Sequence, residues 1–255
     1  MGRAAQLKKK DNEMLFKVKN RKVKITKSII CNYQRKIERL YAERIRIYNL
    51  YNYESRLKDE RFSLVAGIDE AGRGALAGPV VAAAVILPCQ LFIPYIKDSK
   101  KLTSQKRTEL YCSILNKGKD VGIGIVEAKI IDGINIAQAS FLSMKKAILD
   151  LKEVPDYLLV DGFKIPHLNI SQLPLIKGED KSISIAAASI IAKVYRDNIM
   201  VKFDQKYPQY LFKKNKGYGT EEHLKALLKY GPSEIHRKSY KRVFSNKAKN
   251  EKRKT

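Results

Sequence analysis

The chain has 255 residues, of which 44% are hydrophobic and 30% are charged. This length allows one sizeable hydrophobic core and one small appendage, so we expect a single main domain. The formal net charge is +25, from 51 Lys and Arg against 26 Asp and Glu. An excess of this size predicts a polyanionic partner such as nucleic acid.

The positive charge is concentrated at the two ends of the chain. Residues 1–60 hold 17 Lys and Arg against 7 Asp and Glu, and residues 237–255 hold 9 against 1. We therefore expect a basic, partly helical N-terminal extension over residues 1–60, a main domain over 61–240 and a basic tail over 241–255. The two ends could bind phosphate groups or serve only as solvated surface.

The sequence also predicts a cytoplasmic protein without membrane contact. No apolar run approaches the roughly 18 residues that a spanning helix needs, and the N-terminus does not resemble a signal peptide. Three cysteines, an odd number without metal-ligand spacing, are typical of reduced thiols in the cytosol.

Apolar residues at three- and four-residue spacing predict one helix or two between residues 27 and 57. This face contains Tyr33, Ile37, Leu40, Tyr41, Ile45, Tyr48 and Tyr51. The face could pack on the main domain, or its tyrosines could stack on bases.

Strands and helices alternate in the rest of the chain. Short apolar runs predict strands at 63–69, 80–87, 121–126, 157–160 and 173–176. Helical periodicity and capping residues predict helices at 103–118, 135–152, 183–206 and 220–229. Such alternation predicts an α/β layer structure in which helices cover a sheet.

Acidic residues stand at the ends of two predicted strands. Asp69 and Glu70 end the first strand and are followed at once by the turn Gly72-Arg73-Gly74. Adjacent strand residues point to opposite faces, but at a strand end both carboxylates could still reach neighbouring hard cations. Asp161 ends another apolar strand, where an unpaired charge would be costly unless a metal or a cationic group lies beside it.

A third acidic pair, Glu179 and Asp180, precedes an alanine-rich helix. Alone, these residues are typical of an ordinary helix start. Together with the strand-end acids they indicate a carboxylate site for Mg²⁺ or Mn²⁺ of the kind that hydrolyses phosphodiesters. The histidines at 167, 223 and 236 are too scattered for a zinc site, and the sequence has neither a Gly-x-Ser-x-Gly elbow nor a Walker-type loop.

Six segments, in chain order, resemble the ribonuclease HII family. They are GIDEAGRGALAGPVVAAAVIL (67–87), DSKKLT (98–103), LLVDG (158–162), KGEDKSISIAAASIIAKVYRD (177–197), KGYGTEEH (216–223) and GPSEIHRKSY (231–240). The resemblance implies a ribonuclease-H-like α/β fold, with a mixed sheet flanked by helices and a C-terminal helical portion. It implies a monomeric endonuclease that hydrolyses the RNA strand of RNA–DNA hybrids and nicks duplex DNA at embedded ribonucleotides, leaving 3′-hydroxyl and 5′-phosphate ends. The long basic N-terminal segment is similar to extensions in one bacterial branch of the family.

The resemblance also assigns roles to single residues. Asp69, Glu70 and Asp161 are implied as ligands of Mn²⁺ or Mg²⁺. The turn Gly72-Arg73-Gly74 is implied to read the ribose 2′-hydroxyl, and Ser99 and Lys100 to contact the substrate backbone. Tyr218 is similar to the family tyrosine that stacks at the RNA–DNA junction, although a loop tyrosine could also simply pack on the core.

The sequence departs from the family pattern at the fourth acid. An aspartate usually follows Lys-Gly directly, whereas here Glu179 holds that place and Asp180 comes next. An ungapped alignment makes Glu179 the expected catalytic residue and keeps Asp180 as the alternative. Two other functions stay open: a hybrid nuclease like ribonuclease HIII, and a non-catalytic basic RNA-binding protein.

Overall fold

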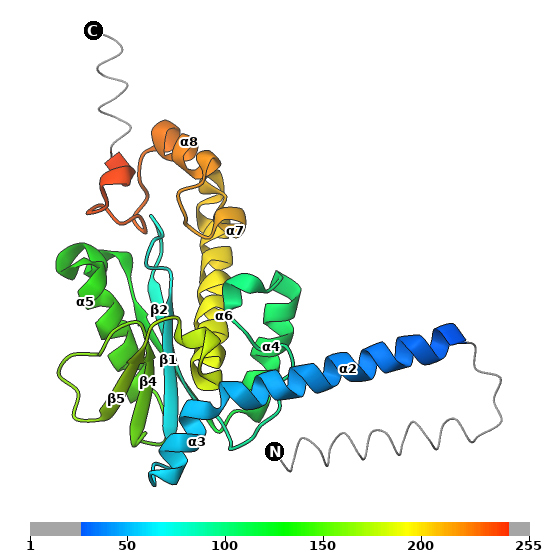
Figure 1. Cartoon of the computed structure of the whole chain (residues 1–255). Helices are drawn as coiled ribbons and strands as arrows, with labels where there is room; N and C mark the ends of the chain where they lie inside the picture. The colour runs from blue at the N-terminus through cyan, green and yellow to red at the C-terminus, as the bar shows by residue number, and fades with distance from the viewer. Residues whose placement is uncertain (1–26, 245–255) are drawn as a thin grey trace. The chain divides into compact units, whose positions relative to one another are not determined.

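Five strands form one mixed sheet in the computed structural model, which describes residues 27–244 (Figure 1). The strands are β1 (Val65–Ala71), β2 (Val80–Ile86), β3 (Asp120–Val126), β4 (Tyr157–Asp161) and β5 (Ser171–Leu175), in the sheet order β3-β2-β1-β4-β5. β1 is antiparallel to β2 and parallel to β4. The carboxyl ends of β1 and β4 therefore meet at the same edge of the sheet.

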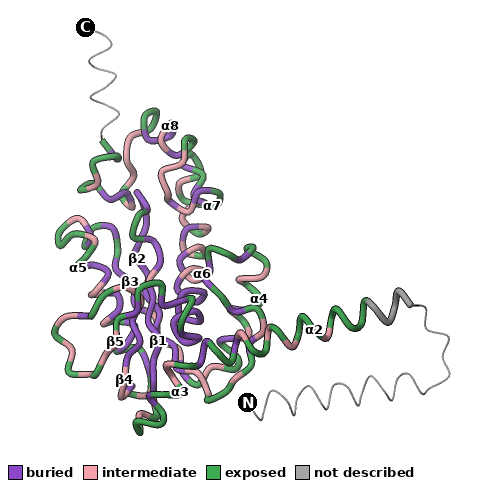
Figure 2. The backbone as a smooth tube through the Cα atoms, viewed as in Figure 1, coloured by how far each residue is buried: buried purple, intermediate pink, exposed green. Residues whose placement is uncertain are grey.

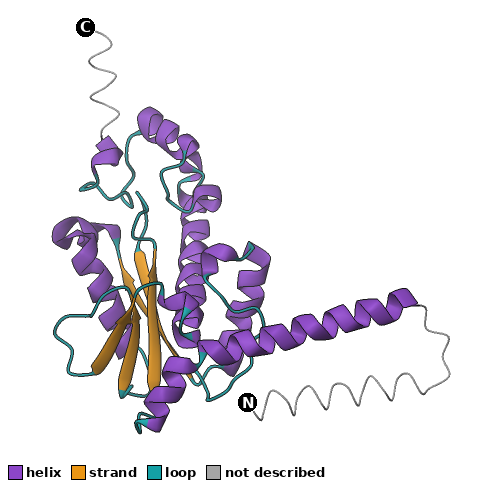
Figure 3. Cartoon of the chain, in the orientation of Figure 1, coloured by secondary structure: helices purple, strands orange, loops and turns teal. Residues whose placement is uncertain are grey.

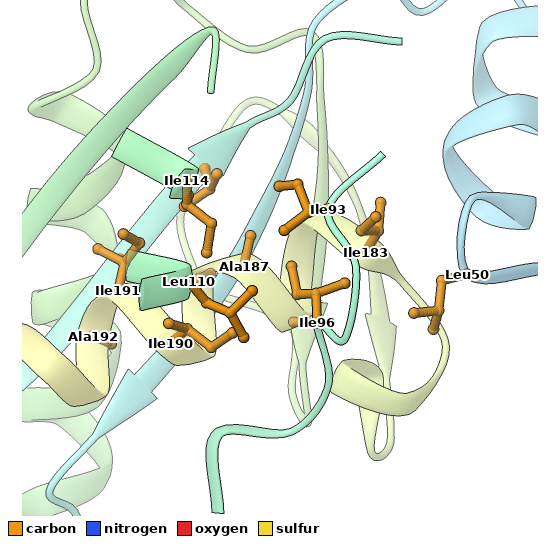
Figure 4. Packing of buried hydrophobic residues seen from close by; sticks show 14 of the residues in the cluster. Leu50, Ile93, Ile96, Leu110, Ile114, Ile183, Ala187, Ile190, Ile191 and Ala192 are labelled. Carbon is orange, nitrogen blue, oxygen red and sulfur yellow. The ribbon is translucent and has the colours of Figure 1, made fainter. Parts of the chain in front are cut away.

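Helix α6 (Ile183–Lys206) packs on one face of this sheet, so close to β1 that only a glycine fits at position 67. A Cβ atom added to Gly67 of β1 would come within 2.1 Å of the Ser184 backbone. Helix α4 (Ser104–Lys117) packs on the same side, where Leu110 and Ile114 contact the apolar side chains of α6 (Figure 4). Ala71, Ala83 and Val85 of the sheet contribute to this cluster, as do Ala186, Ala187 and Ala188 of α6.

Helix α5 (Ala128–Leu149) covers the opposite face, so the sheet lies between two helical layers (Figure 3). The predicted start at Asn135 was wrong as the start of the whole helix, which begins at Ala128. Asn135 nevertheless has a left-handed φ of 67°, and its side chain accepts hydrogen bonds from the backbone N–H groups of Ala137 and Gln138. It therefore caps the second part of a kinked helix.

The C-terminal helical portion surrounds a small core of its own. Helices α7 (Phe212–Asn215) and α8 (Glu221–Tyr230) follow α6 after a short 3₁₀ turn. Leu76, Met200, Tyr210, Phe212 and Leu227 belong to its buried cluster, which joins the loop after β1 to the C-terminal helices. The buried residues run through the strands and α6, while the outward faces of the helices are exposed (Figure 2).

Two N-terminal helices, α2 (Lys27–Leu50) and α3 (Asn52–Asp59), cover the range where periodicity predicted one helix or two. The structure groups the chain into two units, Met1–Glu43 and Arg44–Thr255. Among residues 44–60 the buried residues are Ile47, Leu50, Tyr51 and Leu57, whereas Ile45 and Tyr48 are exposed. The predicted apolar face was thus wrong in part, because the buried side of the helix includes Tyr51 but not Ile45 or Tyr48. The predicted domain boundary near residue 60 stays a prediction.

The other predicted elements are confirmed with small shifts. Helix α6 has the predicted bounds, and α4 begins after Thr103, whose side chain accepts a hydrogen bond from the Lys106 backbone. Among the helices of residues 27–244, none combines the length and apolarity that crossing a membrane requires.

Candidate active site

Asp69 and Asp161 lie on neighbouring parallel strands at the same edge of the sheet. The last residues paired between the two strands are Ile68 and Val160. Asp69 and Asp161 directly follow them, one on each strand. Asp69 is 6% exposed. Burial, together with the charges of Glu70 and Asp161, raises the pKa of Asp69 well above its ordinary value. The two strand ends therefore hold repelling carboxylates in a poorly solvated place.

A pair of serines on α6 and the adjacent turn supports Asp69. The Ser189 side chain hydrogen-bonds to Asp69 and lowers its pKa in part. The Ser99 hydroxyl lies 3.0 Å from the Ser189 hydroxyl, and both serines are buried. Ser99 thus reaches the site through Ser189, and its predicted contact with the substrate backbone stays a prediction.

Glu70 faces Arg73 of the adjoining turn. The Arg73 Nη1 donates a hydrogen bond of 3.1 Å to Glu70 Oε1, and about half of the Arg73 side chain is exposed. Burial raises the pKa of Glu70 and the nearby Asp161 charge adds to this, while the Arg73 guanidinium partly opposes the shift. As predicted for adjacent strand residues, Asp69 and Glu70 use different neighbours, yet their charges interact.

Glu179 faces Asp161, whereas Asp180 does not. The short 3₁₀ helix η2 (Gly178–Asp180) places the Gly178 N–H 2.7 Å from Asp161 Oδ1. Glu179 is buried, and burial with the neighbouring Asp161 carboxylate raises its pKa. Asp180 is exposed and accepts hydrogen bonds of 2.7 and 2.8 Å from Lys101. Of the two candidates, only Glu179 belongs to the acidic cluster.

Lys100 lies at the open side of this cluster. Its Nζ is 3.9 Å from Glu179 Oε1, and most of its side chain is exposed. Partial burial lowers the pKa of Lys100, but the carboxylates of Asp98, Asp69, Glu179 and Asp161 raise it above its ordinary value overall. The Lys100 ammonium group therefore compensates part of the negative charge of these carboxylates.

The chemistry of the four acids fits a hard divalent cation. Mg²⁺ and Mn²⁺ take carboxylate oxygens, and Glu179 Oε2 is buried without a hydrogen-bond partner in the described part of the chain. Burial first and repulsion between the carboxylates second raise the pKa values of Asp69, Glu70 and Glu179, and the charge of a bound cation would favour their ionised forms. Among residues 27–244 no group of three or more His, Cys, Asp or Glu side chains is close enough to hold a metal ion as it stands.

Two buried arginines hold the turn that follows β1. Arg196 of α6 donates from its guanidinium to the carbonyls of Pro79, Ala77 and Lys216, and Arg237 donates to those of Gly78 and Arg73. Both side chains are 0% exposed. A buried charge is costly unless hydrogen bonds compensate it, so these bonds tie the turn to α6 and the C-terminal segment. Arg237 Nη2 is buried without a hydrogen-bond partner among the described residues.

The two glycines of the turn differ in what they require. Gly72 has φ +95°, and a Cβ atom there would lie 2.0 Å from Arg196 Nε. A Cβ atom on Gly74 would meet nothing within 4 Å. The fold therefore requires glycine at position 72. Position 74 has open space around it, as is expected of a residue that contacts substrate.

Tyr218 lies in the loop between α7 and α8, next to this turn. Its ring centroid is 5.3 Å from the Arg196 guanidinium and 5.5 Å from Lys193 Nζ. Tyr218 is partly exposed, and its predicted stacking at the RNA–DNA junction stays a prediction. The structure therefore brings the acidic cluster, the glycine turn and Tyr218 to one side of α6.

Sequence reasoning missed several residues that build this region: Glu54, Ser189, Arg196, Arg237, His223 and His236. Ser189 and Arg196 stood inside a segment that resembles the family, so the resemblance could have marked them. Ser99 lies 90 residues from Ser189 and Pro79 lies 117 residues from Arg196, and no local pattern indicates such contacts.

Paired acidic strand ends on a mixed sheet, covered by α5 on one face and by α4 and α6 on the other, define a ribonuclease-H-like nuclease. The sequence profile of the family Ribonuclease HII matches residues 66–243. Ribonuclease HII of Caldanaerobacter subterraneus subsp. tengcongensis is 56% identical over 195 residues, which are 76% of this chain and 81% of that protein. Ribonuclease HII of Bacillus subtilis is 54% identical over 197 residues, 77% of either chain.

The ribonuclease H2 structure from Pyrococcus horikoshii OT3 has a TM-score of 0.63 and 26% identity, covering 76% of this chain and 100% of that one. The chain belongs to the ribonuclease HII family and is a ribonuclease H endonuclease. The expected fold is confirmed. The alternatives of a ribonuclease HIII and of a non-catalytic RNA-binding protein are not favoured, since the profile and both relatives are of the HII type.

Proposed function

We propose that this nuclease hydrolyses the RNA strand of RNA–DNA hybrids and nicks duplex DNA at embedded ribonucleotides, with Mn²⁺ or Mg²⁺ held by Asp69, Glu70, Asp161 and Glu179. The observation that carries the proposal is the meeting of buried, mutually repelling carboxylates at the ends of β1 and β4. When bound, such ions activate a water molecule and stabilise the leaving oxygen, so that 3′-hydroxyl and 5′-phosphate ends result.

The protein's own groups keep the carboxylates in place. The Gly178 N–H orients Asp161, and Ser189 orients Asp69. Lys100 lies at the exposed side of the cluster, where a scissile phosphate would approach, and its positive charge would attract that phosphate. Arg73 is half-exposed beside Glu70, and its positive charge would attract a phosphate of the same nucleic-acid strand.

Recognition of the ribonucleotide is assigned to the turn Gly72-Arg73-Gly74 and to Tyr218. A 2′-hydroxyl distinguishes RNA from DNA, and backbone groups of a glycine turn can come close enough to hydrogen-bond to it. The open space at Gly74 and the rigid support from Arg196 and Arg237 suit that task. Tyr218 would stack at the RNA–DNA junction, and the basic chain ends would add phosphate contacts. We place this monomeric enzyme in the cytoplasm.

A cleavage and metal-binding experiment tests the proposal. Labelled duplexes, one a uniform hybrid and one carrying a single ribonucleotide, are incubated with Mn²⁺, with Mg²⁺ or with EDTA. Mn²⁺ binding is measured separately by electron paramagnetic resonance for wild type, Glu179→Gln and the neighbouring control Asp180→Asn. We expect both duplexes to be cut only with metal, and weaker Mn²⁺ binding in Glu179→Gln alone. Metal-independent cleavage, or equal Mn²⁺ binding by all three proteins, would contradict it.

A further inference from the structure

Two histidines, His223 and His236, form a buried pair in the C-terminal portion. Their Nε2 atoms are 2.9 Å apart, and the residues are 0% and 1% exposed. His223 lies in the first turn of α8, and His236 lies in the segment that bridges to Ala77. The rings of Tyr210 and Phe212 pack around them. Neither histidine can touch a substrate.

The hydrogen bonds around the pair allow one arrangement of protons. The Ser233 backbone N–H donates to His236 Nδ1 at 2.9 Å, so that nitrogen is an acceptor. The neutral His236 ring then carries its proton on Nε2 and donates it to His223 Nε2. His223 must therefore carry its proton on Nδ1, from which it donates to the Tyr218 carbonyl at 2.9 Å. The chain of bonds runs in one direction, from Ser233 to Tyr218.

Burial keeps both rings neutral, as this arrangement requires. Loss of hydration lowers the pKa of each histidine. A proton added to His223 would place two N–H groups face to face at 2.9 Å, and one added to His236 would remove the acceptor for Ser233.

This chain of bonds closes around the segment that follows the glycine turn. The N–H groups of Leu76 and Ala77 donate to the Gly217 carbonyl at 2.8 and 3.2 Å. On the other side, the Gly78 N–H donates to the Ile235 carbonyl, and the Arg237 N–H donates to the Leu76 carbonyl, each at 2.9 Å. Residues 76–78 thus lie between the Tyr218 loop and residues 235–237, and the histidine pair joins these two outer segments directly.

We propose that His223 and His236 are positioning residues, which hold Tyr218 at a set distance from the turn Gly72-Arg73-Gly74. The inference rests on the proposed role of Tyr218 in reading the RNA–DNA junction. A single embedded ribonucleotide offers one junction and so depends on this distance. In a uniform hybrid every residue of one strand is a ribonucleotide, so a displaced Tyr218 ring should affect its cleavage less. A merely structural role would reduce cleavage of both duplexes equally.

Two substitutions of His223 separate its two hydrogen bonds. In His223→Asn the amide N–H stands near the Nδ1 position and keeps the bond to the Tyr218 carbonyl, whereas in His223→Gln the amide stands near Nε2 and keeps only a partner for His236. His167→Asn is the matched control, because His167 is exposed and has a positive φ of 55°, which Asn accepts. Melting temperatures are recorded for every variant.

The readout is kcat/KM on the single-ribonucleotide duplex divided by kcat/KM on the uniform hybrid. Because both are measured in one protein solution, the folded fraction cancels. One hydrogen bond corresponds to about a 3- to 10-fold change, so we expect His223→Gln to lower the ratio by that factor. His223→Asn and His167→Asn should keep it. An unchanged ratio in His223→Gln, or an equal fall in His223→Asn, would overturn the inference.

A double-mutant cycle with Tyr218→Ala shows whether His223 acts through the ring. Tyr218→Ala alone should lower the ratio, and adding His223→Gln should then change nothing further. If Tyr218→Ala lowers the ratio but His223→Gln does not, only the positioning role falls. If Tyr218→Ala leaves the ratio unchanged, the proposed role of Tyr218 fails and the positioning role with it. Additive effects would show that His223 acts on another group, which also overturns the inference.

Discussion

The Glu54 carboxylate accepts a hydrogen bond of 2.6 Å from the Ser182 hydroxyl, and Ser182 is the residue that caps α6. The same carboxylate accepts a bond of 3.1 Å from the Ser184 N–H. Burial raises the pKa of Glu54, and the hydrogen bonds from Ser182 and Ser184 partly oppose this shift. Since η2 with Glu179 immediately precedes Ser182, helix α3 supports the start of α6 beside the fourth acid.

We predict that a chain beginning at Arg61 loses stability, whereas one beginning at Arg44 keeps it. The first deletion removes the buried side chains of Ile47, Leu50, Tyr51 and Leu57, and each buried apolar side chain contributes about 1.5–3 kcal/mol. Thermal unfolding of both truncated proteins beside the full chain measures the difference. Equal melting temperatures for all three would show that residues 44–60 are dispensable, as the predicted boundary near residue 60 implies.

Asp161→Asn is expected to abolish cleavage while binding to hybrid duplex survives or tightens. The substitution removes one charge from a cluster of repelling carboxylates and keeps an acceptor for the Gly178 N–H. Fluorescence anisotropy without divalent metal measures binding, and a gel assay with Mn²⁺ measures cleavage. Normal turnover by this variant would exclude Asp161 from the metal site.

The fourth acid gives a ranking of three variants. We expect Glu179→Gln to reduce the cleavage rate at least 10-fold, Glu179→Asp to be tolerated and Asp180→Asn to have little effect. Asp180 is exposed and pairs with Lys101, and such surface pairs contribute about 0–1 kcal/mol. Single-turnover rates at saturating enzyme give the comparison. An essential Asp180 with a dispensable Glu179 would reverse the assignment.

The two glycines of the turn should behave differently. Gly72→Ala places a side chain at φ +95° against Arg196 and should cost more than about 1 kcal/mol of stability. Gly74→Ala meets nothing within 4 Å, so its melting temperature should stay near wild type while cleavage at a ribonucleotide falls. Urea unfolding and cleavage are measured on both variants. A stable, fully active Gly74→Ala would remove Gly74 from substrate reading.

Acid should destabilise the protein through the histidine pair. Burial lowers the pKa of His236 to about 3 in the folded state, below the value of about 6.5 in unfolded chains. The neutral ring's contribution to stability is therefore complete above pH 6.5 and is lost as the pH falls from 6.5 toward 3, by about 1.4 kcal/mol per pH unit.

Urea unfolding of wild type and of His236→Asn near pH 7 and near pH 5 isolates this contribution. The stability advantage of the wild type over His236→Asn should shrink at the lower pH. If the difference in unfolding free energy between wild type and His236→Asn were the same at both pH values, the neutral His236 ring would not contribute to stability as predicted.

Local signals were sufficient for most elements and for the strand-end acids. The bounds of α6 follow from Ser182 as cap and from an unbroken helical pattern, because capping and periodicity act within a few residues. Asp69 and Asp161 could be recognised because a carboxylate at the end of an apolar strand needs a partner. The start of α5 was missed because Asn135 has capping chemistry but lies at a kink, and only packing on the sheet continues the helix across it.

The sequence by itself determined the two helical layers, the family and the strand-end acids, since these depend on patterns within short segments. The tertiary structure decided which of Glu179 and Asp180 belongs to the cluster, because Lys101 takes up Asp180 and Asp161 faces Glu179 across distances that no local pattern encodes. It also decided that Arg196 holds the turn after β1 and that His223 holds the Tyr218 loop. A buried charge or ring must find its hydrogen-bond partners wherever the chain brings them: Arg196 bonds to Pro79, 117 residues away, and His223 bonds to His236 of the segment after α8.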